Sequence, residues 1–600
     1  MTRPTAHPEL DRNHLAFRRL LASAQAHLHR GRPAAAAASA QVAAQFAWLN
    51  PCGIFASAEL EELLVEIARG LPPAGPPLAR ASVPRTVLHV ATQAYQTGGS
   101  TQFIASWADQ DAGRHHVVCV TRQLSVPVPV KLGSRESLTV RRIDGEPGGI
   151  LARAVALRRL AAGADVILVH AHPCDVVPVL ALGAHPDTLP PVVYVDQADH
   201  VFWVGVSIAQ SLLSMRKSGA ELAVARRGVD ASRPVIAMRP LQFPGRQLDR
   251  VAAKRALGVD PSDVVVVTAA DASKYDRVGP RSLVEMILPV FAEHGGARLL
   301  AAGPAPEGEW ARAEAWTQGR VRALGQLTDP SILHQAADIY LDSFPFSSLT
   351  SLLESGSLGN PVVTFRGHPD ECAVLGADTI GVDEQMFRPR TPDDLRRQLV
   401  RLIEDGPFRI ASGVATRRAV VERHGAGWLA EAERVYRHAA ASTPVRDPGA
   451  AERGTGQLEE LVRLVVTRSP HSQGIAGAVR GTLGLLPLPQ RLSAAAALRR
   501  NGVSLGPVDL LPDRSRVLLT RAKRAAERTV FSRVWQSPPA TSQGARAGRR
   551  PGRQLNGGNR PDRQPEARIL LEAHARPPVE QQVLEDTHIG GEKIREKQGA

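Results

Sequence analysis

A cluster of small polar residues lies in the segment 341–365, LDSFPFSSLTSLLESGSLGNPVVTF, where a strand, a loop, a short helix and a second strand are expected. The cluster stands where the loop meets the helix and consists of Ser347, Ser348, Thr350 and Ser351. A helix N-terminus carries partial positive charge and free N–H groups, so this arrangement would suit a diphosphate. Glu354, one turn later, is placed for a sugar hydroxyl. An ordinary turn capped by serine or threonine explains the same residues about equally well.

Two other segments place chemical groups directly after apolar strands. Lys274 follows the strand VVVVTAAD, and Arg277 lies three residues later as a second cation. A solvated loop lysine is the alternative for Lys274. Gly98 and Gly99 follow an earlier strand, in TQAYQTGGSTQ, where a backbone could approach a phosphate or a sugar.

Histidines follow two strands in the first half of the chain. His200 lies in the segment VDQADHVFW together with Asp196 and Asp199, after a buried strand. An imidazole can take a proton from a hydroxyl near neutral pH, so His200 is the candidate catalytic residue, with a histidine bonded to a neighbouring loop as the alternative. His170 and His172 end the strand DVILVHAH and rank second, His172 as a sugar or acceptor ligand.

The loop FRGHPDECAVLG adds His368 as a residue that could border the sugar or the acceptor. No set of histidines, thiols and carboxylates has metal-ligand spacing, so no metal site is expected. Neither a Walker A sequence nor a GxGxxG followed by a ribose acid is present, which weakens kinase and dehydrogenase interpretations. We expect no cofactor, because a nucleotide sugar would be a substrate.

The elements that must position these groups alternate between short Val, Ile and Leu strands and helices. This pattern predicts an α/β protein with two doubly wound, Rossmann-like domains, at residues 84–245 and 246–442. Residues 233–245 contain several prolines and are expected to be a hinge. A cleft would then lie between the carboxyl ends of the two sheets.

The two ends of the chain differ from this pattern. Residues 1–83 predict a helical hairpin followed by a proline-rich linker, with Ser57 capping a helix to residue 69. Residues 443–535 predict a helical extension. Residues 536–600 are rich in Pro, Gly, Gln and Arg and predict a disordered, basic tail.

The formal net charge of +14 is concentrated near the C-terminus, because residues 491–560 hold 15 Lys or Arg and only 3 Asp or Glu. Few aromatic residues accompany these cations, so no nucleic acid is expected as a partner. Residues 514–536 interleave basic and apolar residues, which suits either peripheral contact with an anionic membrane or a surface helix packed on the body.

The four cysteines are widely spaced, which favours a reduced, cytoplasmic location, with peripheral contact at the inner face of the membrane as an option. The first 20 residues have no apolar core, and no run of about 18 apolar residues occurs, so we expect neither a signal peptide nor a membrane span.

Over about residues 84–440 the pattern resembles the GT-B glycosyltransferases. The segment LDSFPFSSLTSLLESGSLGNPVV resembles the donor site of the O-linked N-acetylglucosamine transferase group, and in part that of the broad retaining family with sucrose and trehalose synthases. In the retaining family two glutamates lie seven residues apart on this element. Here Glu354 fits the second place, but Ser347 stands at the first, so inversion and retention both stay open.

The resemblance implies a metal-independent transfer of a sugar from a nucleotide-diphosphate sugar to a glycan, lipid-linked or protein acceptor, as in bacterial cell-surface glycan synthesis. Lys274, Arg277, Ser348, Thr350, Ser351 and Glu354 would bind the donor. A nucleotide-sugar 2-epimerase shares the architecture and is one alternative. A non-catalytic scaffold acting through its basic tail is the other.

Overall fold

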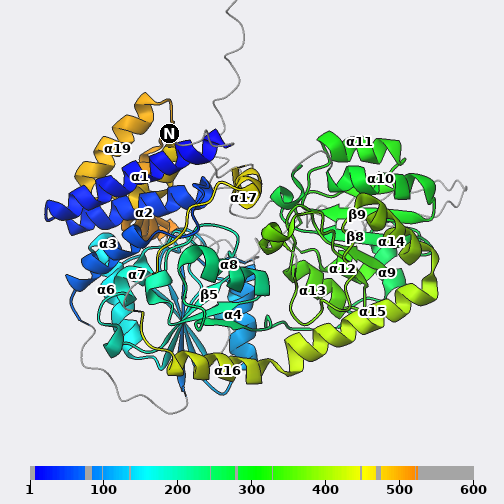
Figure 1. Cartoon of the computed structure of the whole chain (residues 1–600), viewed down its shortest axis with the longest axis horizontal. Helices are drawn as coiled ribbons and strands as arrows, with labels where there is room; N and C mark the ends of the chain where they lie inside the picture. The colour runs from blue at the N-terminus through cyan, green and yellow to red at the C-terminus, as the bar shows by residue number, and fades with distance from the viewer. Residues whose placement is uncertain are drawn as a thin grey trace, which may run out of the picture.

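The computed structural model describes residues 7–523 except 74–83, 97–98, 134–136, 244, 278–281, 328, 377, 446–448, 468–473 and 521. It confirms the α/β class, with two parallel sheets that lie side by side and are each covered by helices (Figure 1). Gly98 and the expected tail, residues 536–600, lie outside the described residues.

The first domain is built on a seven-stranded parallel sheet in the order β3-β2-β1-β4-β5-β6-β7. Its central strands are mostly apolar and are buried along nearly their whole length because helices cover both faces. The strands are β1 Thr86–Ala91, β2 His115–Val120, β3 Leu138–Arg142, β4 Val166–Val169, β5 Val192–Asp196, β6 Ser211–Ser214 and β7 Pro234–Ile236. The helices are α4 Gly99–Gln110, α5 Val130–Gly133, α6 Gly149–Ala162, α7 Val177–Leu182 and α8 Lys217–Arg227.

Two of these strands were not expected. β6 and β7 extend the sheet past β5, so residues 234–236 belong to the sheet although the sequence predicts a hinge there. Both strands are short, and serine or proline begins each of them, which hides the strand pattern. The chain therefore leaves the first domain only after Ile236.

The second domain has a five-stranded parallel sheet in the order β10-β9-β8-β11-β12. The predicted strand, loop, helix and strand are confirmed as β11, α13 and β12. The strands are β8 Val264–Ala269, β9 Ala297–Ala302, β10 Val321–Ala323, β11 Ile339–Leu341 and β12 Val362–Val363. The helices are α9 Arg250–Ala256, α10 Leu283–Glu293, α11 Gly308–Trp316, α12 Ser331–Ala336, α13 Thr350–Ser357, α14 Pro392–Glu404 and α15 Gly406–Val421.

Helix α16, Trp428–Ala441, brings the chain back to the first domain, as its path along the lower edge of Figure 1 shows. Trp428 and Tyr436 are buried in one apolar cluster with Phe103 and Trp107 of α4. The Trp107 indole donates a hydrogen bond of 2.7 Å to the Tyr436 hydroxyl. The last helix of the predicted second domain is thus part of the first domain's core.

The N-terminal region contains the predicted helical hairpin, α1 Pro8–His29 and α2 Pro33–Leu49, followed by the helix expected after Ser57, α3 Ala58–Arg69. Ser57 caps α3 as predicted, accepting a hydrogen bond from the Leu60 backbone. Glu61 of α3 is buried, and its carboxylate accepts hydrogen bonds from the backbone of Gly205, Val206 and Ser207. This carboxylate fixes the N-terminal helices on the first domain.

The C-terminal extension is helical as predicted and lies against the N-terminal helices and the first domain (Figure 1). Its helices are α17 Gln457–Thr467, α18 Gly474–Thr482 and α19 Leu488–Arg500, and residues 513–520 are also helical. Within the described part of residues 514–536, Leu518 and Leu519 are exposed. Among the described residues, no helix combines the length and the apolar character needed to cross a bilayer.

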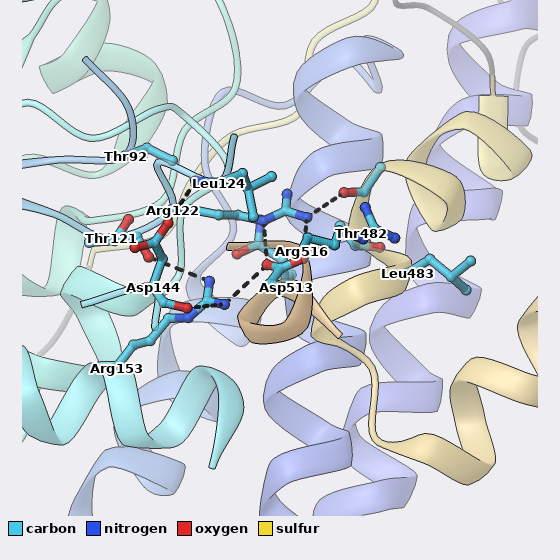
Figure 2. A network of polar contacts seen from close by, with 12 residues as sticks. Thr92, Thr121, Arg122, Leu124, Asp144, Arg153, Thr482, Leu483, Asp513 and Arg516 are labelled. Carbon is cyan, nitrogen blue, oxygen red and sulfur yellow. Dashed lines mark hydrogen bonds and ion pairs between the residues drawn. The ribbon is translucent and has the colours of Figure 1, made fainter. Parts of the chain in front are cut away.

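Asp513 attaches this extension to the first domain (Figure 2). Its buried carboxylate accepts hydrogen bonds from Arg122 at 2.8 Å and from Arg153 at 3.1 Å. Burial alone would raise the pKa of Asp513, but these two guanidinium groups hold it well below its ordinary value. Gly484 is required beside it, because a Cβ at that position would collide with the carboxylate.

Replacing Asp513 by asparagine is expected to loosen the extension, because two guanidinium groups are left buried without a counter-charge. The cost is about 3 kcal/mol, or roughly 100-fold faster local opening. Hydrogen exchange of the amides of α18 and α19 measures this change. Asp509→Asn, which alters a half-exposed acid nearby, is the control, and equal exchange in the two variants would contradict the role of Asp513.

The pH dependence of this attachment has a defined sign. Because the pKa of Asp513 is depressed in the folded chain, its stabilisation is fully present above the ordinary value of 3.8 and is lost as the pH falls through the lower folded-state pKa.

Candidate active site

A cavity of about 260 Å³ lies between the two domains. The residues lining it lie at the carboxyl ends of strands or in the segments that follow them, so the carboxyl ends of both sheets face it, as in other doubly wound folds. The first domain contributes Gly99, Ser100, Asp196, Gln197, Asp199, His200, Met215, Arg216 and Arg239. The second contributes Lys274, Phe346, Ser348, Leu349 and Thr350.

Three cations line this cavity. Lys274 donates a hydrogen bond of 2.8 Å to the Ser347 carbonyl, and burial, with Arg216 nearby, lowers its pKa to about 8. Arg216 bonds the Val374 carbonyl at 2.8 Å, so it reaches across from the first domain to the second. Arg239 is buried, burial lowers its pKa to about 10, and its Nε has no hydrogen-bond partner among the described residues.

Two helix N-termini meet across the same cavity. Gly99 begins α4 and Thr350 begins α13, and a Cβ added to Gly99 would lie 3.7 Å from the Thr350 hydroxyl. The same Cβ would lie 3.2 Å from Arg239, whose Nη2 donates to the Gly99 carbonyl. Gly99 is therefore closely surrounded by protein groups, while the approach of a phosphate or a sugar to it stays a prediction. The three cations and the partial positive charge of the two helix N-termini together make the cavity electrostatically suited to an anion such as a diphosphate.

Two carboxylates and a histidine also line the cavity. Asp199 is paired, with Oδ1 at 3.4 Å from Nδ1 of His200 and Oδ2 at 4.0 Å from Nε of Arg216. Asp196 is buried, and neither of its oxygens has a hydrogen-bond partner among the described residues. Burial raises the pKa of Asp196 to about 7, whereas burial lowers the pKa of His200.

Asp342, directly after β11, organises the loop between β11 and α13, in which a donor site was predicted. Its buried carboxylate accepts the hydroxyl hydrogen bonds of Ser347 at 2.6 Å and Ser348 at 2.7 Å, and the backbone N–H of Ser348 at 2.9 Å. The Ser348 hydroxyl lines the cavity, but its proton is already donated to Asp342 within the loop. The groups of this loop that face the ligand space are therefore Lys274, which is bonded to it, and Thr350.

Several predicted site residues lie outside the lining of this cavity. His172 packs between the rings of Tyr95 and Trp48. His368 bonds the Pro345 carbonyl at 2.7 Å and stacks on Phe344.

The remaining predicted donor residues are close to the cavity but do not line it. Arg277 pairs with Glu285. Ser351 lies in the first turn of α13, beside Thr350. Glu354 is one turn further along; burial raises its pKa and the charge of Arg239 opposes this shift. Glu354 therefore faces the first domain's arginine.

The structure adds residues that the sequence did not single out. Arg216 and Arg239 follow β6 and β7, the two strands whose pattern was too weak to recognise. Asp342 stands directly after the recognised strand β11, and a charged residue at that position was the signal that could have found it. Asp196 was named beside His200 in the sequence, and the structure places it on the cavity.

A larger cavity, of about 500 Å³, lies on the second domain away from the interdomain site. Its arginines are already engaged: Arg409 bonds the carbonyls of Leu402 and Ile403, and Arg417 bonds that of Ser357. Arg250 pairs with Asp338. Size alone therefore does not make this cavity the better candidate.

No protein-family model matches the chain, and no curated protein matches it. Solved structures with a similar fold include a glycosyltransferase from Rickettsia africae ESF-5, with 13% identity, a TM-score of 0.47 and coverage of 60% of this chain and 100% of the other. WaaG, a glycosyltransferase involved in lipopolysaccharide biosynthesis, has 15% identity, a TM-score of 0.41 and coverage of 58% and 99%.

A mutant of the Thermobaculum terrenum O-GlcNAc transferase has 16% identity, a TM-score of 0.41 and coverage of 72% and 82%. At these identities and TM-scores the likenesses do not extend to activity or substrate. The topology of this chain itself gives the architecture: it has the GT-B fold, two Rossmann-like domains that face each other across a polar cavity.

Proposed function

We propose that the chain is a glycosyltransferase that moves a sugar from a nucleotide-diphosphate sugar to an acceptor hydroxyl. One observation carries the proposal: an interdomain cavity is lined by three cations, two helix N-termini and the buried carboxylate of Asp196. The cations and helix N-termini suit a diphosphate leaving group, and the carboxylate suits the role of a proton acceptor. The cavity would therefore offer groups for both the nucleotide-sugar donor and the acceptor.

The cations would act on the donor. As the bond between the sugar's anomeric carbon and the diphosphate oxygen breaks, negative charge builds on the nucleoside diphosphate. Lys274, Arg216 and Arg239 are fixed before the reaction and can stabilise that charge without reorganising. We propose that these groups serve in place of a divalent metal.

Asp196 would act on the acceptor. The acceptor oxygen forms the new bond to the anomeric carbon, and its proton passes to the Asp196 carboxylate as the nucleoside diphosphate leaves. A base with a pKa near the working pH is the most effective, and Asp196 meets this condition. His200, the residue chosen from the sequence, is a weaker base because burial and the charges of Lys274 and Arg216 lower its pKa. We assign it to binding a sugar or acceptor hydroxyl.

Thermal denaturation of the full-length chain with UDP, GDP, ADP and their glucose conjugates tests the donor site. One nucleotide at about 100 times its dissociation constant is expected to add roughly 2.7 kcal/mol to the stability, with and without EDTA. The full chain is required because the C-terminal extension packs on the first domain. No stabilisation by any nucleotide would overturn the proposal and favour a scaffold.

Product analysis separates transfer from epimerisation, the other reaction expected for this architecture. A transferase releases the nucleoside diphosphate only in step with glycosylation of an acceptor, whereas an epimerase returns an isomeric nucleotide sugar without any acceptor. We propose a glycan, lipid-linked or protein acceptor and a cytoplasmic location, with peripheral membrane contact through residues 514–536.

A further inference from the structure

A chain of hydrogen bonds crosses the first domain from the cavity to the opposite end of its sheet. Ser100 donates from its hydroxyl to Oε1 of Gln197, whose Nε2 lies 3.1 Å from Nδ1 of His170. Nε2 of His170 lies 3.1 Å from Nδ1 of His89, and Nε2 of His89 lies 3.0 Å from Nδ1 of His116. At the far end, Nε2 of His116 lies 3.0 Å from the carbonyl of Asp111.

The far end fixes the direction of every bond in this chain. A carbonyl oxygen can only accept, so Nε2 of His116 must carry its proton, and Nδ1 of a neutral imidazole must then accept. The same reasoning applies to His89 and then to His170: in each ring Nε2 carries the proton and donates, and Nδ1 accepts. In the reverse direction, the lone pair of His116 Nε2 would face the Asp111 carbonyl, and the buried Asp111 carboxylate 3.8 Å away adds to that cost.

The surroundings keep all three histidines neutral. All three are buried, and burial lowers the pKa of each, that of His170 to about 3. His170 contacts the ring of Phe103, and His89 contacts that of Trp107. Around His116, the charge of Asp111 raises the pKa while those of Arg114 and His115 lower it. The three histidines are therefore neutral, and the hydrogen bonds that join them all run in one direction.

The direction determines what Ser100 offers to the cavity. Since His170 must accept from Gln197, the Gln197 amide turns its Oε1 toward Ser100, and the Ser100 proton is used in that bond. Only the lone pairs of the Ser100 oxygen remain for a ligand. Ser100 lines the cavity, as does the loop between β11 and α13 of the second domain.

We propose that Ser100 is a specificity-determining acceptor for a hydroxyl of the donor sugar, and that His170, His89 and His116 are positioning residues that fix its polarity. The inference rests on the proposed function, because it takes a nucleotide sugar as the ligand. A hydroxyl that donates is bound at this place. A group that can only accept, such as a sugar ether or fluorine, is rejected because two lone pairs would face each other.

Nitrogen-15 NMR of the full-length wild-type chain with labelled histidine tests the direction and needs no variant. The three buried imidazoles are expected to show an unprotonated Nδ1 and a protonated Nε2, unchanged between pH 8 and pH 6. Any of the three with the proton on Nδ1, or with titration near pH 6.5, overturns the proposal.

Calorimetric binding of UDP, GDP, ADP and their glucose conjugates tests the consequence. The measured quantity is the sugar increment, defined as the Kd of a nucleoside diphosphate divided by that of its glucose conjugate. Ser100→Ala and His89→Leu are each expected to lower the increment by roughly 5- to 10-fold, with the Kd of the nucleoside diphosphate unchanged. His115→Leu is the matched control, since His115 is the exposed neighbour of His116 on the same strand.

The outcomes separate this inference from the proposed function. An unchanged increment in Ser100→Ala, or no increment in the wild type, overturns the role of Ser100 while nucleotide binding still supports the transferase. No binding of any nucleotide or conjugate overturns both. If His89→Leu does not fold, Ser100→Ala and the NMR measurement still decide.

Discussion

Replacing Asp196 by asparagine is expected to lower kcat by about 10²- to 10⁴-fold, which is the range for a lost general base. The Kd of the nucleotide sugar should change little, because the cations that bind the diphosphate are untouched. Asparagine keeps the shape of the side chain and cannot take the proton. Steady-state kinetics with the nucleotide sugar that binds, together with calorimetric Kd values, measure both quantities.

The pH profile and the stability of the same variant provide the control. In the wild type, kcat/KM should fall as the pH drops below about 7, because Asp196 becomes protonated, and this limb should be absent in Asp196→Asn. Since burial raises the folded-state pKa to about 7, the chain loses stability as the pH rises from the ordinary value of 3.8 toward about 7, and the whole loss is present above that pH. Asp196→Asn should therefore raise the melting temperature at pH 8. A loss of activity with a lower melting temperature would contradict a catalytic role.

A single displacement with Asp196 as base also predicts the stereochemical result. The new bond forms on the face opposite the leaving diphosphate, so the anomeric configuration is expected to invert. Proton NMR of the product measures the configuration. A retained configuration would rule out this use of Asp196 and return attention to the departing phosphate as the proton acceptor.

The order of apolar strands and helices was enough to predict the two Rossmann-like domains. Strands such as β4 and β8 are runs of valine, isoleucine and leucine, and a parallel strand covered on both faces requires such runs. Strands β6 and β7 were not predicted, because they have only four and three residues and contain serine or proline, so their sequences show no clear run of apolar residues. Arg216 and Arg239 were missed with them.

Some of the predicted site residues lie on the cavity, and their roles there stay predictions. Gly99, Lys274 and Thr350 lie in segments that follow strands, and the structure places all three on the cavity. Ser348 also lies on the cavity, held by Asp342 of its own loop, whereas Glu354 depends on Arg239 of the other domain, a tertiary partner that the sequence does not show. The packing of α16 in the first domain's core also depends on tertiary contacts that the sequence pattern does not show.

Replacing Lys274 by methionine is expected to lower kcat/KM by about 10²- to 10³-fold, because the leaving diphosphate loses a fixed cation in a buried site. Methionine preserves the length of the side chain and its contact with the Phe346 ring, over which Nζ now lies at 4.2 Å. Lys217→Met is the control, since Lys217 is 73% exposed and pairs only with a surface glutamate among the described residues. An equal effect of both substitutions would contradict a specific role.

The pH profile of Lys274→Arg shows whether the charge at this position controls activity at alkaline pH. Because burial lowers the pKa of Lys274 to about 8, the wild type should lose kcat/KM as the pH rises above that value. An arginine keeps its charge there, so this alkaline limb should disappear in Lys274→Arg even if the absolute rate is lower. With Asp196 controlling the acid limb, the wild-type profile should be a narrow bell between about pH 7 and pH 8. An alkaline limb that persists in Lys274→Arg would assign the titration to another group and remove Lys274 from the donor site.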